Sequence, residues 1–222
     1  MYQFNFAPVF AGFDQLAMGA WLTIQLSVAA MVIGLIVSIL CAAGKTSGIT
    51  PLRFVIDVYI EVIRNTPFLV QIFFIFFGLP SLGLRLTPNS AALLALVINF
   101  GAYGTEIIRA GIESIQKGQV EAGTALGLSK LQIFRYIVVK PALRTVYPAL
   151  TSQFIYLMLT SSVVSAISAD DLAAAGNNLQ SQTFASFEVY IVITLMYLVM
   201  STGFSAIFAV IEKAAFKYPL SR

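Results

Sequence analysis

The ionisable residues that could do chemistry in this chain are few, and three of them lie close together. Asp57, Glu61 and Arg64 are spaced by four and three residues, so a helix would place them on one face. Two carboxylates one turn apart suit proton transfer, as in an enzyme that works within a membrane. The sequence has no histidine, and Cys41 is its single cysteine, so we expect no metal site of the usual His/Cys kind. The two carboxylates alone are too little to name a reaction.

The same residues fit two other roles. Arg64 would complement a substrate carboxylate if it lined a path through a membrane, and Pro67 would free backbone groups beside it. A structural ion pair at one end of a helix explains the spacing equally well, so both interpretations stay open. Glu106 and Arg109 are three residues apart and are expected to pair along a helix. The candidates for a substrate path are Glu61, Arg64, Thr66, Pro67, Thr160, Ser161 and Ser162.

The three hydroxyl residues of that set have an equally simple structural role, because small residues let helices approach closely. Another stretch, Gly44-Lys45-Thr46, is similar to the end of a phosphate-binding loop. That loop needs a glycine five residues before Gly44, where Ile39 stands, and it follows a strand. We therefore predict no nucleotide site and no catalytic residue in this chain.

A polar island at 118–132 has the pattern of two helices that meet at a sharp turn. Gly127 suits the left-handed position that ends a helix. Ser129 can begin the next helix, with Gln132 as the returning partner of a capping box. We call residues 118–138 the elbow, and we expect its second helix to gather Leu131, Phe134, Ile137 and Val138 on one face.

Composition places the whole chain in a membrane. The 222 residues are 59% hydrophobic and only 10% charged, whereas a soluble domain has about 25% charged residues. The amino terminus lacks the basic run of a cleaved signal peptide. No repeat or linker divides the sequence, so residues 1–222 are predicted to form a single domain.

Five stretches are apolar enough to cross a bilayer, which takes about 20 residues. The predicted fold is therefore an all-α integral membrane protein of five transmembrane helices, with the elbow between spans 3 and 4. A kink or break is expected at Pro67, in the second span. A polar loop is expected from Ala169 to Phe187. The spans run over Ala17–Ala43, Phe54–Leu79, Ser90–Glu113, Thr145–Ile167 and Glu188–Ile211.

Basic residues give the orientation, because they favour the cytoplasmic side. With the amino terminus outside, the external segments hold only Arg85. The elbow then lies in the cytoplasm. The cytoplasmic segments hold Lys45, Arg53, Arg109, Lys117, Lys130, Arg135, Lys140, Arg144, Lys213, Lys217 and Arg222.

The elbow resembles the cytoplasmic coupling motif of ABC-importer permease subunits. That family has Glu-Ala-Ala, three residues and then Gly, which Glu121, Ala122 and Gly127 match. Gly123 replaces the second Ala, and Lys140 stands where a proline is usual, with Pro141 one residue later. The resemblance implies that an ATPase subunit is contacted by Glu121, Ala122, Gly123, Gly127, Leu128 and Ser129.

Further likeness points to the permeases of polar amino acid uptake, the histidine/glutamine/arginine-type branch. Residues 59–71, Tyr-Ile-Glu-Val-Ile-Arg-Asn-Thr-Pro-Phe-Leu-Val-Gln, are similar to that branch's Glu-x-x-Arg-Gly-Thr-Pro signature, with Asn65 for Gly. The likeness covers almost everything from Ala17 to Ala214. Many members carry a Lys-Asp pair before the Thr-Ser of the fourth span, where Leu159-Thr160 stand here. Any substrate contact of that pair does not transfer.

The resemblance implies an importer that moves a polar amino acid inward across a bacterial inner membrane. It implies two copies of an ABC ATPase subunit that binds ATP and Mg, a second permease chain, identical or homologous, and an extracytoplasmic amino-acid-binding protein. This chain itself is expected to bind no cofactor and no nucleic acid. A channel or an autonomous secondary carrier is the competing class, and uptake by the chain alone would distinguish it.

Overall fold

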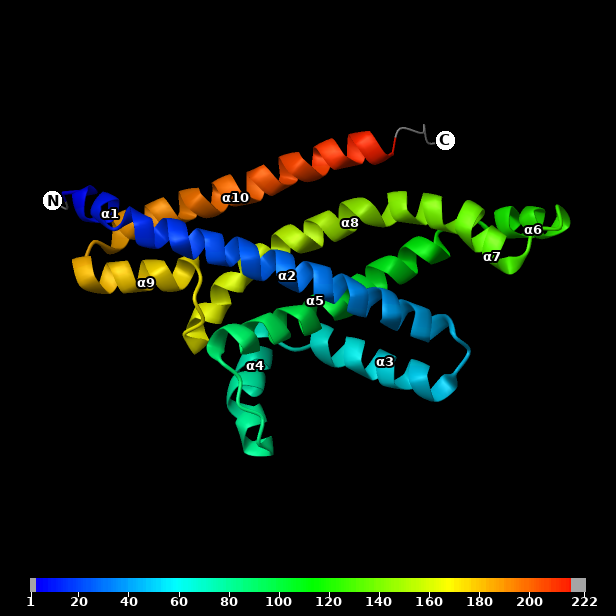
Figure 1. Cartoon of the computed structure of the whole chain (residues 1–222), viewed down its shortest axis with the longest axis horizontal. Coiled ribbons are helices and arrows are strands. Elements are labelled where there is room, and N and C mark those ends of the chain that lie inside the picture. Colours follow the sequence, from blue (N-terminus) through cyan, green and yellow to red (C-terminus); the bar gives the residue numbers. More distant parts are fainter. Residues whose placement is uncertain (1–2, 217–222) are drawn as a thin grey trace.

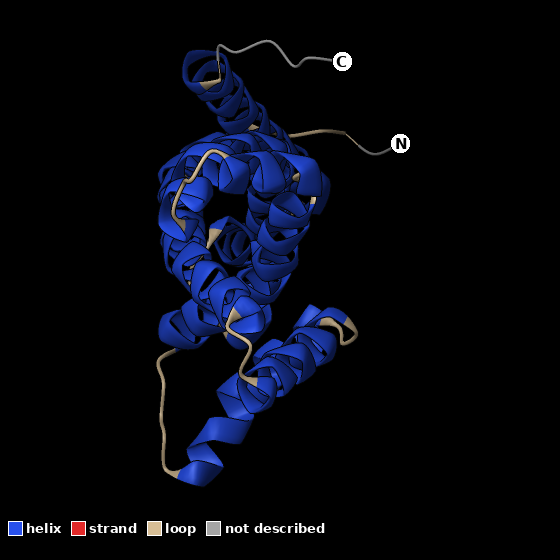
Figure 2. Cartoon of the chain, turned by 90° about the vertical axis from the view of Figure 1, so that its right-hand side faces the viewer, coloured by secondary structure: helices blue, strands red, loops and turns tan. Residues whose placement is uncertain are grey.

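The structure is a computed structural model that describes residues 3–216, so Lys217 and Arg222 of the predicted cytoplasmic tail lie outside the described residues. The described residues form helices and loops, with no strand among them (Figures 1 and 2). The amino-terminal end and the tip formed by α6 and α7 lie at opposite ends of the long axis (Figure 1).

The longest helix organises the others. Short α1 (Ala7–Ala11) leads into α2 (Phe13–Thr46), whose 34 residues span about 51 Å. The largest interface in the fold joins α2 to α5 (Pro88–Glu113). Small residues let the two backbones approach, since a Cβ added at Gly104 would overlap Ser38 Oγ. Ser38 Oγ donates to the carbonyl oxygen of Gly101 across the interface at 3.1 Å.

The second apolar stretch is broken, as the sequence predicted, and the break is large. It forms α3 (Thr50–Arg64) and α4 (Phe68–Phe73), which continues through a π-helical stretch over Phe74–Gly78 and a 3-10 turn over Leu79–Leu82. The two arms are bent by 112°. The second arm projects sideways from the body (Figure 1).

The second helix of the elbow runs directly into the fourth span. After α6 (Lys117–Ala125), helical structure is continuous through α7 (Lys130–Gln132), a π-helical stretch over Ile133–Val138, α8 (Val139–Thr160) and a 3-10 stretch over Ser161–Ile167. The helix that contains this span thus begins well before Thr145, where the sequence placed the start of the span. The elbow and the span are two ends of one helical rod.

The predicted polar loop between the last two spans contains a helix. It is α9 (Leu172–Thr183), whose first turn is capped by the side chain of Asp171. Leu172, Gly176 and Leu179 are buried at helical spacing, against α2 and α10 (Ser186–Ala215). The polar residues between them hid this spacing.

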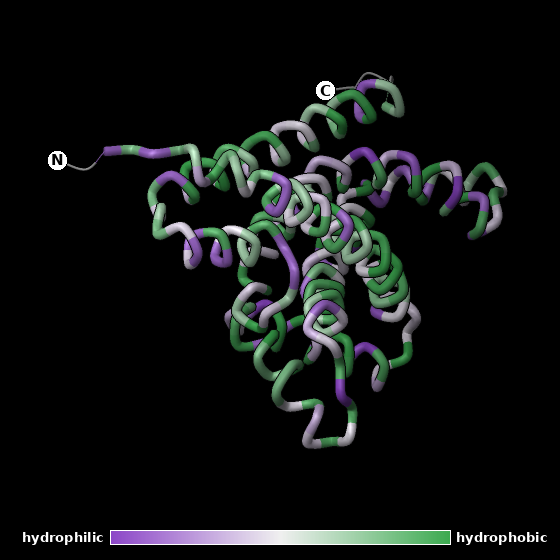
Figure 3. Tube along the Cα trace, turned by 60° about the vertical axis from the view of Figure 1, so that its left-hand side comes forward, coloured by the Kyte–Doolittle hydropathy of each residue, from purple (hydrophilic) through white to green (hydrophobic). Residues whose placement is uncertain are grey.

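Four helical segments are long and apolar enough to cross a membrane, and the bent pair α3–α4 makes a fifth if it is one span. Apolar residues run along these segments (Figure 3). Their surfaces are largely uncovered on α2, α8 and most of all α10, whereas α5 is mostly buried. The main core lies where α2, α4, α5 and α8 meet, around Leu96, Phe100 and Phe154. The predicted all-α membrane fold is thus confirmed, with four or five candidate spans in the described residues.

Candidate functional site

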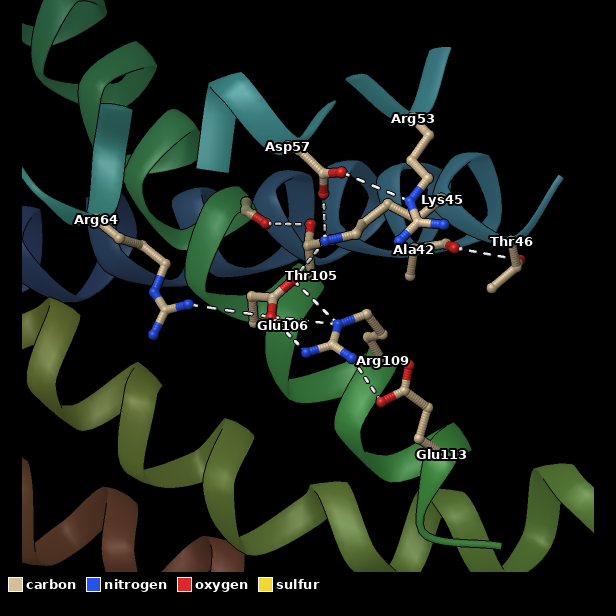
Figure 4. A network of polar contacts seen from close by, with 11 residues as sticks. Ala42, Lys45, Thr46, Arg53, Asp57, Arg64, Thr105, Glu106, Arg109 and Glu113 are labelled. Carbon is tan, nitrogen blue, oxygen red and sulfur yellow. Dashed lines mark hydrogen bonds and ion pairs between the residues drawn. The ribbon is translucent and has the colours of Figure 1, made fainter. Parts of the chain in front are cut away.

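A cluster of charged side chains joins α2, α3 and α5 near the predicted cytoplasmic end. The charged cluster consists of Lys45, Asp57, Arg64, Glu106 and Arg109 (Figure 4). Each helix contributes at least one member, so the cluster connects the consecutive helices α2 and α3 to α5, which lies further along the chain.

Glu106 is the centre of the charged cluster. Its Oε1 accepts from Lys45 Nζ at 2.9 Å, and its Oε2 accepts from Arg109 Nη2 at 2.8 Å. Arg64 Nη1 lies 4.0 Å from Oε2. Lys45 also contacts Asp57 at 2.6 Å, and its side chain is only 13% exposed. Charges in so apolar a setting are stable only in such pairs.

The charges of α3 have other partners than the sequence suggested. Among the described residues, no ion pair joins Arg64 to Glu61 or to Asp57. Asp57 pairs with Lys45 and with Arg53, and exposed Glu61 accepts a hydrogen bond from Asn65 Nδ2 at 2.7 Å. The expected ion pair of Arg64 with a carboxylate of its own helix is therefore wrong, because Arg64 approaches Glu106 of α5. Asp57 pairs instead with Lys45 of α2 and with Arg53 of α3. The predicted Glu106–Arg109 pair is confirmed.

Arg64 is the most accessible part of the cluster beside the break. Its side chain is 42% exposed, and its guanidinium lies 5.6 Å from the centre of the Tyr103 ring. Thr66 and Pro67 follow it at the break between α3 and α4. Arg64, Thr66 and Pro67 thus lie together at the break, and the guanidinium of Arg64 is accessible to solvent or to a ligand.

The three hydroxyl residues of the fourth span lie where α8 changes to 3-10 geometry. Ser161 is buried and donates to the carbonyl oxygen of Met158 at 2.7 Å, and Ser162 donates to that of Leu159 at 2.9 Å. Thr160 is half-buried. These bonds give the serines a local structural role, and a role in a path stays a prediction.

The elbow has the geometry that its sequence predicts. Gly127 has a φ of +75°, and its N–H donates to the carbonyl oxygen of Thr124. The N–H of Leu128 donates to that of Gly123, which completes a Schellman motif. Ser129 and Gln132 form a reciprocal capping box. Local hydrogen bonds therefore fix the angle between the two helices.

Packing inside the elbow leaves its tip apolar and exposed. Gly123 is buried against Ile133 and Ile137, where an added Cβ would lie 2.5 Å from Ile137 Cδ1. Leu126 and Leu131 are 80% and 75% exposed. Of the predicted apolar face, Leu131 and Phe134 are exposed, whereas Ile133, which was not assigned to that face, packs inward. Glu121, Ala122 and Ser129 are also exposed, and Leu128 is half-buried.

Sequence reasoning missed Lys45 as a member of the charged cluster. Its position at the end of the first span looked like an ordinary boundary charge. No signal in the sequence marked it, because helical spacing already offers Arg53 to Asp57 and Arg109 to Glu106. Lys45 reaches both carboxylates through the packing of α2 on α3 and α5.

Comparison with known sequences agrees with this geometry. Residues 30–217 match the family of the binding-protein-dependent transport system inner membrane component. The glutamine transport system permease protein GlnP of Escherichia coli (strain K12) is 35% identical over 213 residues, which cover 95% of this chain and 97% of that protein. The L-cystine transport system permease protein TcyB of Bacillus subtilis (strain 168) is 32% identical over 219 residues, 98% of this chain and 91% of that one.

Solved structures show the same fold. A chain from the crystal structure of an amino acid ABC transporter with histidines superposes with a TM-score of 0.90 at 36% identity, over 96% of this chain and 100% of that one. A chain of the inward-facing MetNI methionine ABC transporter shares the fold at 21% identity and a TM-score of 0.72, over 90% of this chain and 96% of that one. The chain therefore belongs to the binding-protein-dependent transport system inner membrane components, the multi-pass permease subunits of bacterial ABC importers.

Proposed function

We propose that this permease subunit carries a polar amino acid or a close analogue inward, with its amino terminus outside and its elbow in the cytoplasm. Relatives named for glutamine and for cystine, and a related amino acid transporter structure, support the substrate class. The distribution of basic residues supports the orientation.

The elbow is the proposed contact with the ATPase. One observation supports this role. The tip of the elbow exposes Leu126 and Leu131, is fixed by local hydrogen bonds, and is continuous with the helix of the fourth span. A push on the tip is then transmitted along the rod to α8 and the core around Phe154. Glu121 and Ala122 lie on the neighbouring helix of the elbow, open to a partner.

The remaining partners follow from what one chain lacks. ATP and Mg belong to the ATPase, of which the complex holds two copies. Five spans form half of a pathway, and the uncovered apolar faces of the chain are suited to lipid and to a second permease chain, identical or homologous. The solute is delivered by an external amino-acid-binding protein. Opening and closing of the path is then an alternation between two states that nucleotide binding biases.

In this scheme the Arg64 corner is the proposed part of the substrate path. A half-exposed guanidinium at a helix break can bind a substrate carboxylate. Glu106 lies closer to Lys45 and Arg109 than to Arg64, so Arg64 is the most loosely paired cation of the cluster. Glu61, Thr66 and Pro67 adjoin it, and Thr160, Ser161 and Ser162 remain further candidates.

Labelling with an impermeant thiol reagent tests orientation and docking together. In a Cys41→Ser background, a cysteine at Asn177 should react from outside and one at Gln119 should not. A cysteine at exposed Leu131 should react in opened membranes and become protected when the ATPase is bound. Reversed accessibility would contradict the orientation, and full reactivity of residue 131 in the assembled complex would contradict the elbow as the docking site.

A further inference from the structure

The break between α3 and α4 leaves carbonyl groups of α3 without their usual donors. In a continuous helix the carbonyl oxygen of Ile63 accepts from the N–H of residue 67, but Pro67 has none. An unpaired carbonyl shielded from water is costly, and the buried side chain of Gln71 lies against this one. The chain must supply a donor from elsewhere.

The side chain of Gln71 supplies it. Gln71 lies one turn beyond Pro67, on α4, and its Nε2 donates to the carbonyl oxygen of Ile63 at 2.8 Å. The same nitrogen lies 3.0 Å from the carbonyl oxygen of Thr66 and 2.9 Å from Thr66 Oγ1. The two N–H groups of one amide on the second arm are thus shared among three oxygens on and beside the first arm.

The other end of the Gln71 amide is held by α5. Its Oε1 accepts from Asn99 Nδ2 at 3.3 Å, and both side chains are buried, at 9% and 7% exposure. Asn99 lies two turns before Glu106 on the same helix, and Glu106 is the anion beside Arg64. The break is therefore connected to the helix that carries the centre of the charged cluster.

We propose that Gln71 is a positioning residue that replaces the donor missing at Pro67, holds the two arms at their bend and ties the bend to α5 through Asn99. Arg64 lies three residues before Pro67, so the same bonds fix its guanidinium beside Glu106 and Tyr103. The consequence for import rests on the proposed function, whereas the hydrogen-bond role itself does not.

A double-mutant cycle tests the role without any transport assay. The Tm of the purified transporter is measured for the parent, Gln71→Met, Pro67→Ala and the double variant. Met keeps the length of the side chain and removes its donors, so Gln71→Met should lower the Tm by about 3 to 8 °C. Pro67→Ala restores an N–H at residue 67, which is the donor to Ile63 in a continuous helix. Gln71→Met should therefore lower the Tm by less than half as much in that background. An equal cost in both backgrounds would overturn the proposal.

Two further arms cover a failure to fold. If Gln71→Met does not accumulate in the membrane, accumulation of the Pro67→Ala/Gln71→Met double variant supports the proposal. Failure of the double variant to accumulate overturns it. Gln71→Asn keeps the amide, but its side chain is one methylene too short to reach the carbonyl oxygen of Ile63. It should therefore lower the Tm as much as Gln71→Met does. A Tm equal to that of the parent would overturn the proposal. Gln153→Met is the matched control, since the Nε2 of Gln153 is buried without a hydrogen-bond partner in the described residues and its loss should not lower the Tm.

Discussion

The charged cluster and the elbow are both polar regions of an apolar chain, but they are held together in different ways. The cluster depends on contacts between different helices, such as Lys45 of α2 with Asp57 of α3 and Glu106 of α5. The elbow depends on bonds between residues at most five apart, such as Leu128 with Gly123. Substitutions in the charged cluster should therefore change the stability of the whole fold, whereas substitutions in the elbow should change only the angle between its two helices.

This difference separates stability from function. Removing a charge from the cluster leaves its partners unpaired in an apolar setting, which lowers the stability of the fold. Changing the elbow leaves the spans packed and alters only what its tip can reach. Matched substitutions in the two regions can therefore break or sharpen the comparison.

The largest effect is expected at Gly127. A side chain there must adopt a φ near +75°, at a strain on the order of 1–3 kcal/mol, so Gly127→Val should change the angle of the elbow and reduce uptake to near background. The subunit should still accumulate in the membrane. Co-purification of the ATPase and radiolabelled amino acid uptake are measured side by side.

Gly118→Val is the control for that experiment. Both glycines have open space where a Cβ would lie, but only Gly127 has a positive φ. Equal losses for the two variants, or parental uptake and ATPase binding for Gly127→Val, would remove Gly127 as the pivot.

The next largest effect is expected at Glu106. Glu106→Gln leaves Lys45, Arg64 and Arg109 around a neutral amide, so stability should fall by about 2–4 kcal/mol. The Tm in detergent is the measurement. Combining it with Lys45→Met should recover part of the loss, because one uncompensated cation is then absent. Strict additivity of the two changes would show that the cluster does not act as a unit.

Asp171 gives a smaller and pH-dependent effect, because it is a buried carboxylate that has no ion pair within the described residues. Burial raises its pKa from 3.8 to about 6. The folded state then binds this proton more tightly than the unfolded state, so stability is lost as pH rises from about 4 to 6 and stays lower above. Asp171→Asn keeps the cap on Ala174 and should raise stability at pH 7.5 by about 1–3 kcal/mol.

The check on Asp171→Asn is the Tm as a function of pH. The gain over the parent should vanish below about pH 3, where the parental carboxyl is protonated in both states. A gain that does not change with pH would mean that packing, and not the charge, is responsible.

The smallest effects come from exposed charges, and they contrast directly with Glu106. Arg53→Ala removes an exposed pair on one helix, at 3.6 Å, and should change stability by less than about 0.5 kcal/mol. Glu121→Gln should change the Tm as little, yet weaken co-purification of the ATPase. A Tm loss for Glu121→Gln as large as that of Glu106→Gln would erase the distinction between the two regions.

How well the sequence predicted each region follows from the range of its interactions. The caps at Gly127 and Ser129 and the break at Pro67 depend on neighbours in the chain, and the structure has them where the sequence places them. The five apolar stretches were recognisable because bilayer thickness sets their length.

What the sequence did not predict depends on packing. The partner of Asp57 comes from α2, and the donor to Ile63 comes from Gln71 across a 112° bend. Neither follows from helical spacing, since both require the angle between helices. Helix α9 was missed because Asn177 and Asn178 interrupt its apolar spacing and made the segment look like a loop.

Reconstitution in liposomes tests the central claim most directly. The chain is reconstituted by itself and, in parallel, with its ATPase and the external binding protein, and uptake of radiolabelled glutamine, arginine, histidine and cystine is followed with and without internal ATP. The account predicts no uptake by the chain alone and ATP-dependent uptake of at least one of these amino acids by the complete system. Uptake by the chain alone, independent of ATP, would contradict it and identify an autonomous carrier or channel.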